Sequence, residues 1–310
     1  MTIVEEMTSK PMTALDGAEK KRPTQWPLPE RATAFGCPRD FMDNRFVYTV
    51  VSPRARGLAV GVNMNPDKSC NFDCAYCEVD RSVSLPESRL DVSVMAAELQ
   101  TTLNFVQQGR LRERPWYQGL PEELLKLRHV AFSGDGEPTL APNFSEAVQA
   151  VVHVRALGGF PFFKIVLITN ATGLDQPQIQ EALKHFTKSD EIWAKLDSGT
   201  QGYFNRVARP KDVLLEKVLS NILLIARQRP VVIQSLFPAV NGEEPPFAEI
   251  EEYAHRLKEL KEQGAQISLV QIYSATRPMF HADCGHLPLK TLSHIAMAVR
   301  QVAGLKAEVF

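Results

Sequence analysis

Two hydrophobic patterns alternate along the chain. Short runs rich in Val, Ile and Leu are typical of buried strands, whereas longer segments with apolar residues every three or four positions are typical of amphipathic helices. The predicted strands cover residues 58–63, 129–133, 164–169, 191–197, 231–237 and 267–274. The predicted helices cover residues 92–108, 142–158, 177–186, 212–228, 247–264 and 287–304.

This alternation predicts an α/β fold. Strands separated by helices pair in parallel through right-handed crossovers, which gives either a barrel or an open doubly wound sheet. A further short strand is predicted at 45–51. The helix at 247–264 ends at Gly264, a good C-terminal cap. Its predicted apolar face consists of Phe247, Ile250, Ala254, Leu257 and Leu260.

We divide the chain into three parts. Residues 1–44 mix Pro, charged and small residues without a sustained period, which predicts a flexible tail and an extended arm. Residues 45–280 form the predicted α/β core, and residues 281–310 form a C-terminal helical extension. The segment between the strands at 58–63 and 129–133 is long for one crossover. We expect it to hold an extra helix and a loop, 112–121, near the substrate.

Composition bears on location more than on chemistry. The 310 residues carry a formal net charge of -1, which gives no indication of a nucleic-acid partner but leaves room for a local basic patch. No apolar run reaches the roughly 20 residues that span a bilayer, and the first residues lack the pattern of a secretory signal. We therefore expect a soluble, cytoplasmic protein with no membrane contact. In a reducing compartment its five cysteines favour metal binding or redox chemistry over disulfides.

Three of the cysteines, Cys70, Cys74 and Cys77, lie in the loop after the first core strand. In parallel α/β folds the loops after the strands converge on the face that carries the chemistry. The spacing C-x3-C-x2-C allows one loop to present three thiolates to three corners of a 4Fe-4S cluster and to supply no fourth ligand. The open iron can then chelate the amine and carboxylate of S-adenosylmethionine (SAM).

Two alternatives remain open for the cysteines. The triplet could hold structural zinc together with the distant Cys37, Cys284 or a histidine, although zinc modules usually have two separated pairs. Cys37 and Cys284 are most simply free thiols. Two further interpretations of Cys284 stay open. Because it lies between His281 and His286, it could belong to an auxiliary metal site, or its thiol could donate a hydrogen atom to a substrate radical.

With this triplet the sequence resembles the radical SAM superfamily. The resemblance implies a partial (β/α)6 barrel of the TIM-barrel type, in agreement with the six predicted core strands. It implies that a 4Fe-4S cluster on the three cysteines reduces SAM, so that a 5'-deoxyadenosyl radical forms and abstracts hydrogen from a substrate. It also implies an electron donor such as flavodoxin or ferredoxin, and it places Tyr76 against the adenine.

The sequence GDGEP at 134–138, after the second core strand, supports this resemblance. Glycines allow the backbone to approach a ligand closely, and Glu137 offers an acceptor at the mouth of the barrel. In the superfamily a Gly-Gly-Glu-Pro-like motif at this position receives the amino group of SAM, and this sequence is similar with Asp135 inserted. We therefore expect Gly134, Asp135, Gly136 and Glu137 to bind SAM. We also expect Gly136→Val to weaken SAM binding without loss of iron.

Polar residues follow the other core strands as well. The further candidates for cofactor binding are Asn170, Lys195, Asp197 and Gln234, and the candidates for substrate binding are Tyr273 and Arg277. Strand alternation points Lys195 and Asp197 to the same side, where they would either form a structural ion pair or hold the SAM carboxylate or ribose. The guanidinium of Arg277 suits a substrate carboxylate or phosphate.

Over residues 57–278 the sequence resembles the iron-sulfur oxidoreductase group that includes the wyosine-type tRNA-modifying enzymes. It shows neither an appended flavodoxin-like domain nor a second cysteine triplet, so both a tRNA base and a small metabolite stay open as substrates. We hypothesise a radical SAM enzyme of oxidoreductase or transferase type. The alternative functions are an iron-sulfur or SAM-binding redox sensor and an activase for a partner protein.

Overall fold

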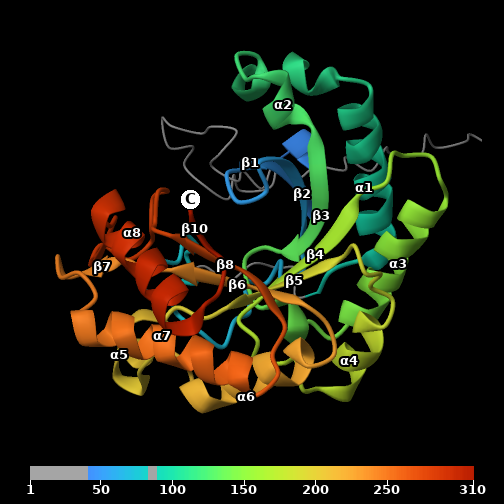
Figure 1. The fold of residues 1–310 in the computed structure, drawn as a ribbon. Coiled ribbons are helices and arrows are strands. Elements are labelled where there is room, and N and C mark those ends of the chain that lie inside the picture. The colour runs from blue at the N-terminus through green and yellow to red at the C-terminus, as the bar shows by residue number, and fades with distance from the viewer. Residues whose placement is uncertain (1–40, 83–88) are drawn as a thin grey trace, which may run out of the picture. The chain divides into compact units, whose positions relative to one another are not determined.

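The structure, a computed structural model, describes residues 41–82 and 89–310, which are built around a curved eight-stranded sheet (Figure 1). In spatial order the strands are β1 (Val47–Ser52), β2 (Gly57–Asn63), β3 (Leu127–Ser133), β4 (Lys164–Thr169), β5 (Glu191–Lys195), β6 (Val231–Leu236), β8 (Ile267–Tyr273) and β10 (Ala307–Val309). Neighbouring strands pair in parallel, except that β1 is antiparallel to β2. No pairing closes the sheet between β1 and β10 in the described ranges, so the barrel is partial.

The predicted α/β fold with a partial barrel of parallel strands is confirmed. All six predicted core strands are present, and β1 confirms the short strand predicted at 45–51. Strand β10 was not predicted because three residues are too few to show a period. A separate two-stranded sheet pairs β7 (Ala239–Val240) with β9 (Cys284–Gly285).

Six predicted helices are confirmed to within a few residues. They are α1 (Val92–Gln107), α3 (Phe144–Ala156), α4 (Pro177–Leu183), α6 (Leu215–Ala226), α7 (Phe247–Glu262) and α8 (Leu289–Ala298), which continues into a π-helical turn at Val299–Ala303. The other helical elements are short and were not among these six, although one of them lies in the segment between β2 and β3 where an extra helix was expected. They are α2 (Glu122–Leu125), α5 (Gln201–Val207) and the turns Phe41–Asp43, Arg110–Glu113, Pro115–Tyr117 and Pro138–Leu140.

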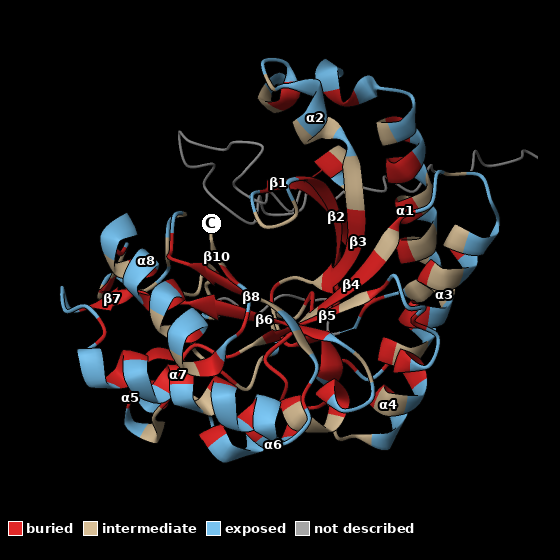
Figure 2. Ribbon diagram, in the orientation of Figure 1, coloured by how far each residue is buried: buried red, intermediate tan, exposed pale blue. Residues whose placement is uncertain are grey.

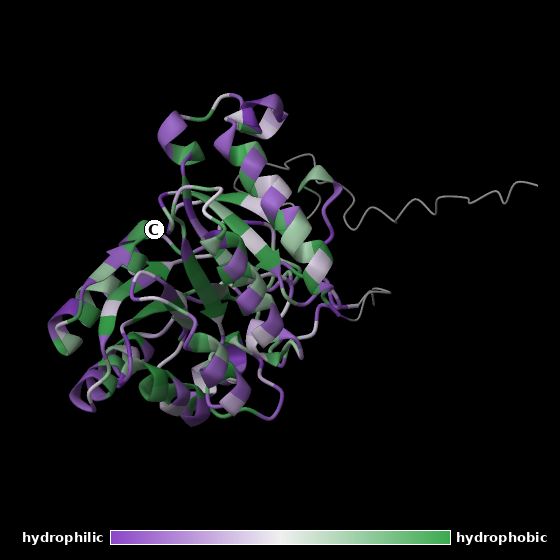
Figure 3. Cartoon of the chain, turned by 90° about the vertical axis from the view of Figure 1, so that its right-hand side faces the viewer, coloured by the Kyte–Doolittle hydropathy of each residue, from purple (hydrophilic) through white to green (hydrophobic). Residues whose placement is uncertain are grey.

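The outer face of the sheet packs against the helices through an apolar core. Alternate strand residues such as Val60, Val130 and Ile165 are buried together with helix residues such as Leu99 and Ile222. Figure 2 shows buried strands with exposed helix surfaces around them, and Figure 3 shows the same strands as mainly hydrophobic. Because side chains alternate along a strand, the remaining strand residues face the opposite, inner side of the sheet.

One residue of the predicted apolar face of α7 is exposed. Phe247 has 73% of its surface exposed, whereas Ile250, Leu257 and Leu260 are buried as predicted. Glu249 is buried instead, because its carboxylate accepts hydrogen bonds from the backbone N–H of Gly199 (2.5 Å) and from Thr200. Phe247, in the first turn, therefore lies outside the buried stripe. The C-terminal cap is confirmed, since Gly264 has φ of 94°.

The two edges of the sheet are held by specific polar contacts. The Glu98 carboxylate of α1 accepts hydrogen bonds from the backbone N–H groups of Arg45, Phe46 and Val47 at the start of β1. Arg56, in the turn between β1 and β2, forms an ion pair of 2.7 Å with Glu308 of β10. The curvature of the sheet thus brings its two edge strands close enough for a side chain to bridge them.

The loop 112–121, predicted near the substrate, packs at the amino end of the sheet. Tyr117 and Leu111 are buried against Leu58 and Val51, near the amino end of β2, whereas the cysteine loop follows the carboxyl end of that strand. The apolar side chains of this segment pack against the base of the sheet, and the expectation that 112–121 lies near the substrate stays a prediction. The predicted tail and arm, 1–44, lie almost wholly outside the described residues, and the domain boundaries stay predictions. None of the helices in the two described ranges is long and apolar enough to cross a membrane.

Candidate active site

The cysteine loop, residues 64–81, is held in place by the end of α5. The backbone N–H of Ala75 donates to the carbonyl of Val207 (2.8 Å), and the N–H of Asp73 donates to the carbonyl of Arg209 (3.2 Å). In return the carbonyl of Asn71 accepts from the N–H of Lys211 (2.9 Å). The loop therefore has a fixed path at the carboxyl end of β2, where the sequence places the chemistry.

The structure brings the three predicted cluster ligands together as free thiols. Cys70, Cys74 and Cys77 are partly buried, and Cys77 lies close enough to the other two for its charge to raise the pKa of both. Burial is the main cause of the shift, and it raises the pKa of Cys70 to about 11. Burial therefore favours the protonated thiols of Cys70 and Cys74, and iron binding would release these protons. Three thiols from one loop are the donor set that a cluster with one open iron needs.

The zinc and auxiliary-metal alternatives stay predictions. Over residues 41–82 and 89–310, no group of three His, Cys, Asp or Glu side chains is placed to hold a single metal ion. Cys284 is buried, while His281 contacts Asp73 and His286 contacts the carbonyl of Ala275. Burial raises the pKa of Cys284 to about 11. Cys37 lies outside the described residues, and hydrogen-atom donation by Cys284 stays a prediction.

The two glycines of the GDGEP turn are required by the protein itself. A Cβ at Gly134, whose φ is 129°, would lie 2.2 Å from Oδ1 of Asn63, and a Cβ at Gly136 would lie 1.9 Å from the carbonyl oxygen of Ser69. Ser69 directly precedes Cys70. The expectation that Gly136→Val spares the cluster is therefore wrong, because the added side chain would strike the cysteine loop. Asp135 is anchored by Asn63, whose Nδ2 donates to its carboxylate (2.7 Å).

The carboxylate of Glu137 is fully engaged within the protein. It is 2% exposed and accepts hydrogen bonds from the hydroxyls of Thr139 (2.6 Å) and Thr169 (2.5 Å) and from the backbone N–H of Asn170 (2.7 Å). Burial raises its pKa, while these hydrogen bonds oppose the shift. Glu137 thus ties the end of β3 to the end of β4, and its predicted contact with SAM stays a prediction.

A second polar cluster joins the cysteine loop to β5 and β8. The predicted pair of Lys195 and Asp197 is confirmed, with 3.1 Å between Nζ and Oδ1. The Tyr76 hydroxyl donates to the other Asp197 oxygen, and Lys195 donates to the Tyr273 hydroxyl (3.1 Å). The Lys195 ammonium also lies 4.9 Å from the Tyr76 ring centroid. The Lys195–Asp197 ion pair therefore fixes Tyr76, which lies between Cys74 and Cys77 in the sequence.

Asn170 and Gln234, the other two cofactor candidates, lie at separate places. Asn170 is in contact with the cysteine loop, because its Nδ2 donates to Oδ1 of Asn71 (2.8 Å). Gln234 is buried on the inner face of the sheet and donates to Gln271 (3.2 Å). Only Asn170 is therefore joined to the cysteine loop by a hydrogen bond.

The segment 277–283 crosses the cysteine loop. Arg277 forms an ion pair with Glu78 (3.0 Å), the residue after Cys77. The backbone N–H of Phe280 donates to the carbonyl of Cys77 (2.8 Å), and His281 lies 3.0 Å from the Asp73 carboxylate. In this structure Arg277 is thus engaged in holding the segment to the loop, and its binding of substrate stays a prediction.

Sequence reasoning missed Arg81. Its guanidinium donates to Sγ of Cys77 (2.9 Å) and to the carbonyl of Asp135 (3.0 Å), so it bridges the cysteine loop and the GDGEP turn. Two atoms beside these contacts, Nε of Arg81 and Oδ1 of Asn65, are buried without a hydrogen-bond partner. Arginine four residues after the last cysteine was the available signal, but a single arginine in a loop is usually a surface residue.

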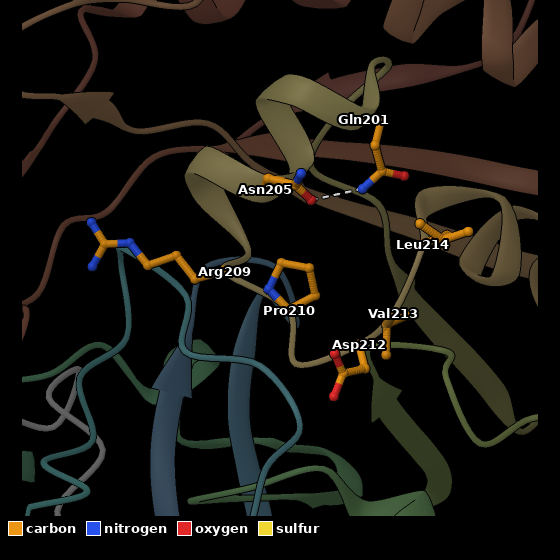
Figure 4. Close-up of a pocket in the computed structure, with 7 residues that line it drawn as sticks. All are labelled: Gln201, Asn205, Arg209, Pro210, Asp212, Val213 and Leu214. Atoms are coloured by element: carbon orange, nitrogen blue, oxygen red, sulfur yellow. Dashed lines mark hydrogen bonds between the residues drawn. The ribbon is translucent and has the colours of Figure 1, made fainter.

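A hollow of about 380 Å³ lies beside α5, and two residues that line it, Arg209 and Pro210, also contact the cysteine loop. Figure 4 shows that Gln201 and Asn205 point toward each other across one side of it, while the Arg209 side chain extends away from the other lining residues. Arg209 pairs with Asp283 instead. The hollow contains none of the residues predicted for cofactor or substrate.

No protein-family profile matches the chain. Among curated proteins it is similar to UPF0026 proteins from Helicobacter pylori (28% identical over 183 residues, 57% of this chain and 50% of the relative) and Methanocaldococcus jannaschii (26% over 174 residues, 56% and 47%). The chain thus spans about half the length of these relatives. Their designation carries no function.

Solved structures show the fold. The chain is similar to TYW1 with a lysine-pyruvate adduct bound (15% identity, TM-score 0.52, 83% of this chain and 84% of that chain). It is also similar to SuiB of Streptococcus suis bound to S-adenosylmethionine (12% identity, TM-score 0.53, 83% of this chain and 52% of that chain). A third similar structure is spore photoproduct lyase (10% identity, TM-score 0.53, 84% of this chain and 79% of that chain). These neighbours are radical SAM enzymes. The chain has the fold of the radical SAM enzymes.

Proposed function

We propose that this protein is a radical SAM enzyme that holds a 4Fe-4S cluster on Cys70, Cys74 and Cys77 and cleaves SAM reductively. The observation that carries the proposal is the position of the triplet, at the carboxyl end of β2 and against the GDGEP turn after β3, in a radical SAM fold. When bound, the cluster would supply the electron that breaks a carbon-sulfur bond of SAM, giving methionine and a 5'-deoxyadenosyl radical.

The residues of the chain would orient these groups. The contact between Gly136 and Ser69 keeps the turn against the cysteine loop, and Arg81 fixes Cys77 to the same turn. Tyr76, held by Asp197, presents a ring beside the triplet on which the adenine could stack. The segment 277–283 covers part of the loop, which limits the access of water to the radical.

The substrate follows less directly from these residues. We propose that hydrogen is abstracted from a small metabolite or a tRNA base, with flavodoxin or ferredoxin as the electron donor. The likeness to TYW1 supports the scaffold and does not select either substrate. A role as redox sensor or as activase would use the same cluster, and no contact in the described residues favours it over catalysis.

The test is formation of 5'-deoxyadenosine from SAM. The protein would be reconstituted anaerobically with iron and sulfide, reduced with dithionite and assayed alone, with a metabolite fraction and with a tRNA fraction from the host. We expect about four irons per chain, slow uncoupled cleavage of SAM, and faster cleavage with one fraction. Stoichiometric zinc without iron, or no 5'-deoxyadenosine under any condition, would contradict the proposal.

A further inference from the structure

We propose that the inner face of the sheet contains an oxyanion-binding site centred on Arg54, which would take the carboxylate or phosphate group of the substrate. This inference rests on the proposed function and adds a chemical class to the unidentified substrate. It also moves the role expected for Arg277 to a different arginine. Arg277 pairs with Glu78, whereas Arg54 pairs with no carboxylate in the described part of the chain.

Arg54 reaches across the inner face from the turn between β1 and β2. Its guanidinium carbon lies 4.0 Å from the centroid of the Tyr273 ring, at the end of β8. Its Nε is buried and has no hydrogen-bond partner. Stacking on an aromatic ring leaves the N–H groups in the guanidinium plane available, and that planar fork matches the two oxygens of a carboxylate or phosphate.

The charges on the inner face leave Arg54 without a counter-ion. Lys164 pairs with Glu191 (2.5 Å), and Lys195 pairs with Asp197 (3.1 Å), so each of these lysines has its own carboxylate. Arg54 is a third cation among them. A partly buried charge without a partner is unfavourable, and a bound anion would remove that cost.

A second unpartnered group lies near Arg54. His129 is 2% exposed on the inner face, and its Nδ1 is buried without a hydrogen-bond partner. Burial lowers its pKa to about 3, with smaller contributions from the charges of Lys164 and Arg54, so the ring is neutral. A neutral imidazole can donate one hydrogen bond to an anion. Two orphaned polar atoms, on Arg54 and His129, therefore face the same side of the sheet.

The site is linked to the cysteine loop by direct contacts. Tyr273 lies under Arg54 and accepts a hydrogen bond from Lys195, and Lys195 lies over the ring of Tyr76, next to Cys77. A substrate anchored by its anionic group at Arg54 would therefore extend along the inner face toward the triplet. Arg54 would act as a substrate-binding residue that sets which compounds are accepted.

The experiment compares anion binding by Arg54→Gln with binding by Arg56→Gln, two residues along the same turn. Arg56 is the matched control because its side chain is 71% exposed and pairs with Glu308. Sodium phosphate and sodium acetate would be titrated separately into the 310-residue protein at constant ionic strength, with binding followed by calorimetry. Neither the cluster nor SAM is needed, so the measurement is independent of the proposed activity.

We expect saturable binding of one anion by the wild type and by Arg56→Gln, and at least tenfold weaker binding by Arg54→Gln. Saturation with phosphate alone assigns a phosphorylated substrate, and saturation with acetate alone assigns a carboxylate. Arg54→Lys, which keeps the charge and loses the fork, should bind with intermediate affinity, and it replaces Arg54→Gln if that variant does not fold. Absence of saturable binding in the wild type, or equal affinity in all variants, would overturn the proposal.

The two proposals fail in distinguishable ways. Anion binding that depends on Arg54, in a protein that forms no 5'-deoxyadenosine, would remove the proposed function and leave an anion-binding site. Formation of 5'-deoxyadenosine by a wild type that binds neither anion would leave the function and remove this site.

Discussion

Two buried aspartates flank β5, and they differ in what they hold. Asp190, before the strand, accepts two hydrogen bonds from Arg155 (2.6 and 3.1 Å) and others from the backbone N–H groups of Ile165 and Thr187 (both 2.7 Å). Asp197, after the strand, pairs with Lys195 and accepts from Tyr76 of the cysteine loop. Both are acid-base pairs beside one strand, yet only the second touches the candidate active site.

The difference follows from the direction of the strands. At the amino ends of the strands the chain arrives from the helices. There the Asp190 carboxylate links α3, β4 and the turn before β5 by hydrogen bonds. At the carboxyl ends, the loops converge, and Asp197 meets a loop from β2. We therefore expect the buried ion pair of Asp190, at the amino ends of the strands, to determine stability. We expect the similar pair of Asp197, at the carboxyl ends, to determine the geometry of the site.

The largest effect is expected at the carboxyl ends, from Cys74→Ala. Two remaining thiolates cannot hold a cubane, so iron content should fall and 5'-deoxyadenosine should become undetectable, while the thermal unfolding temperature changes little. Cys284→Ala is the control, because Cys284 lies in β9 and outside the triplet. Iron analysis and product chromatography check both variants. Reductive cleavage of SAM by Cys74→Ala would contradict the ligand assignment.

At the amino ends, Asp190→Asn should lower the free energy of unfolding by about 3–5 kcal/mol, because it leaves Arg155 buried without its counter-charge. Iron content per folded molecule should not change. Asp197→Asn should reduce both stability and the yield of 5'-deoxyadenosine, since it also releases Tyr76. Chemical denaturation combined with iron analysis distinguishes the effect of Asp190→Asn from the effect of Asp197→Asn. A loss of iron in Asp190→Asn with stability retained would reverse the comparison.

Gly136→Ala tests whether close packing at the carboxyl ends holds the cysteine loop. The added methyl group would lie 1.9 Å from the Ser69 carbonyl oxygen, so the loop must move. We expect a destabilisation of about 1–3 kcal/mol and a lower iron content after reconstitution. Gly202→Ala is the matched control, because no atom lies within 4 Å of its Cβ position. Equal iron content in the two variants would show that the contact is not needed.

Arg81→Gln is expected to change the cluster without removing it. The guanidinium donates to Sγ of Cys77 and carries a positive charge, and both features stabilise the reduced cluster. Its loss should lower the reduction potential, so that the reduced fraction at a fixed potential falls by about tenfold, or roughly 59 mV. A potentiometric titration followed by electron paramagnetic resonance measures this shift. Arg206→Gln, which alters a surface pair with Glu243, should leave the potential unchanged.

The smallest effect concerns pH and the Asp190 carboxyl. Burial raises its pKa, but the hydrogen bonds from Arg155, Ile165 and Thr187 outweigh burial, and the pKa in the folded protein lies below its ordinary value. The stabilisation is therefore present above the unfolded pKa of about 3.9 and is lost as the pH falls through the folded pKa. The difference in unfolding free energy between wild type and Asp190→Asn should shrink from pH 6 to pH 3. A constant difference would exclude this linkage.

The sequence by itself determined the elements that have a local period or a fixed spacing. These are the six core strands, the six longer helices, the cysteine triplet and the shared side of Lys195 and Asp197. They were predictable because spacing, periodicity and alternation along the sequence indicate where each side chain points. Only the tertiary structure decided which distant groups meet. The curvature of the sheet places Arg54 over Tyr273, and the packing of two loops brings Gly136 into close contact with the cysteine loop. Such contacts depend on how whole elements approach one another, which no local pattern of residues encodes.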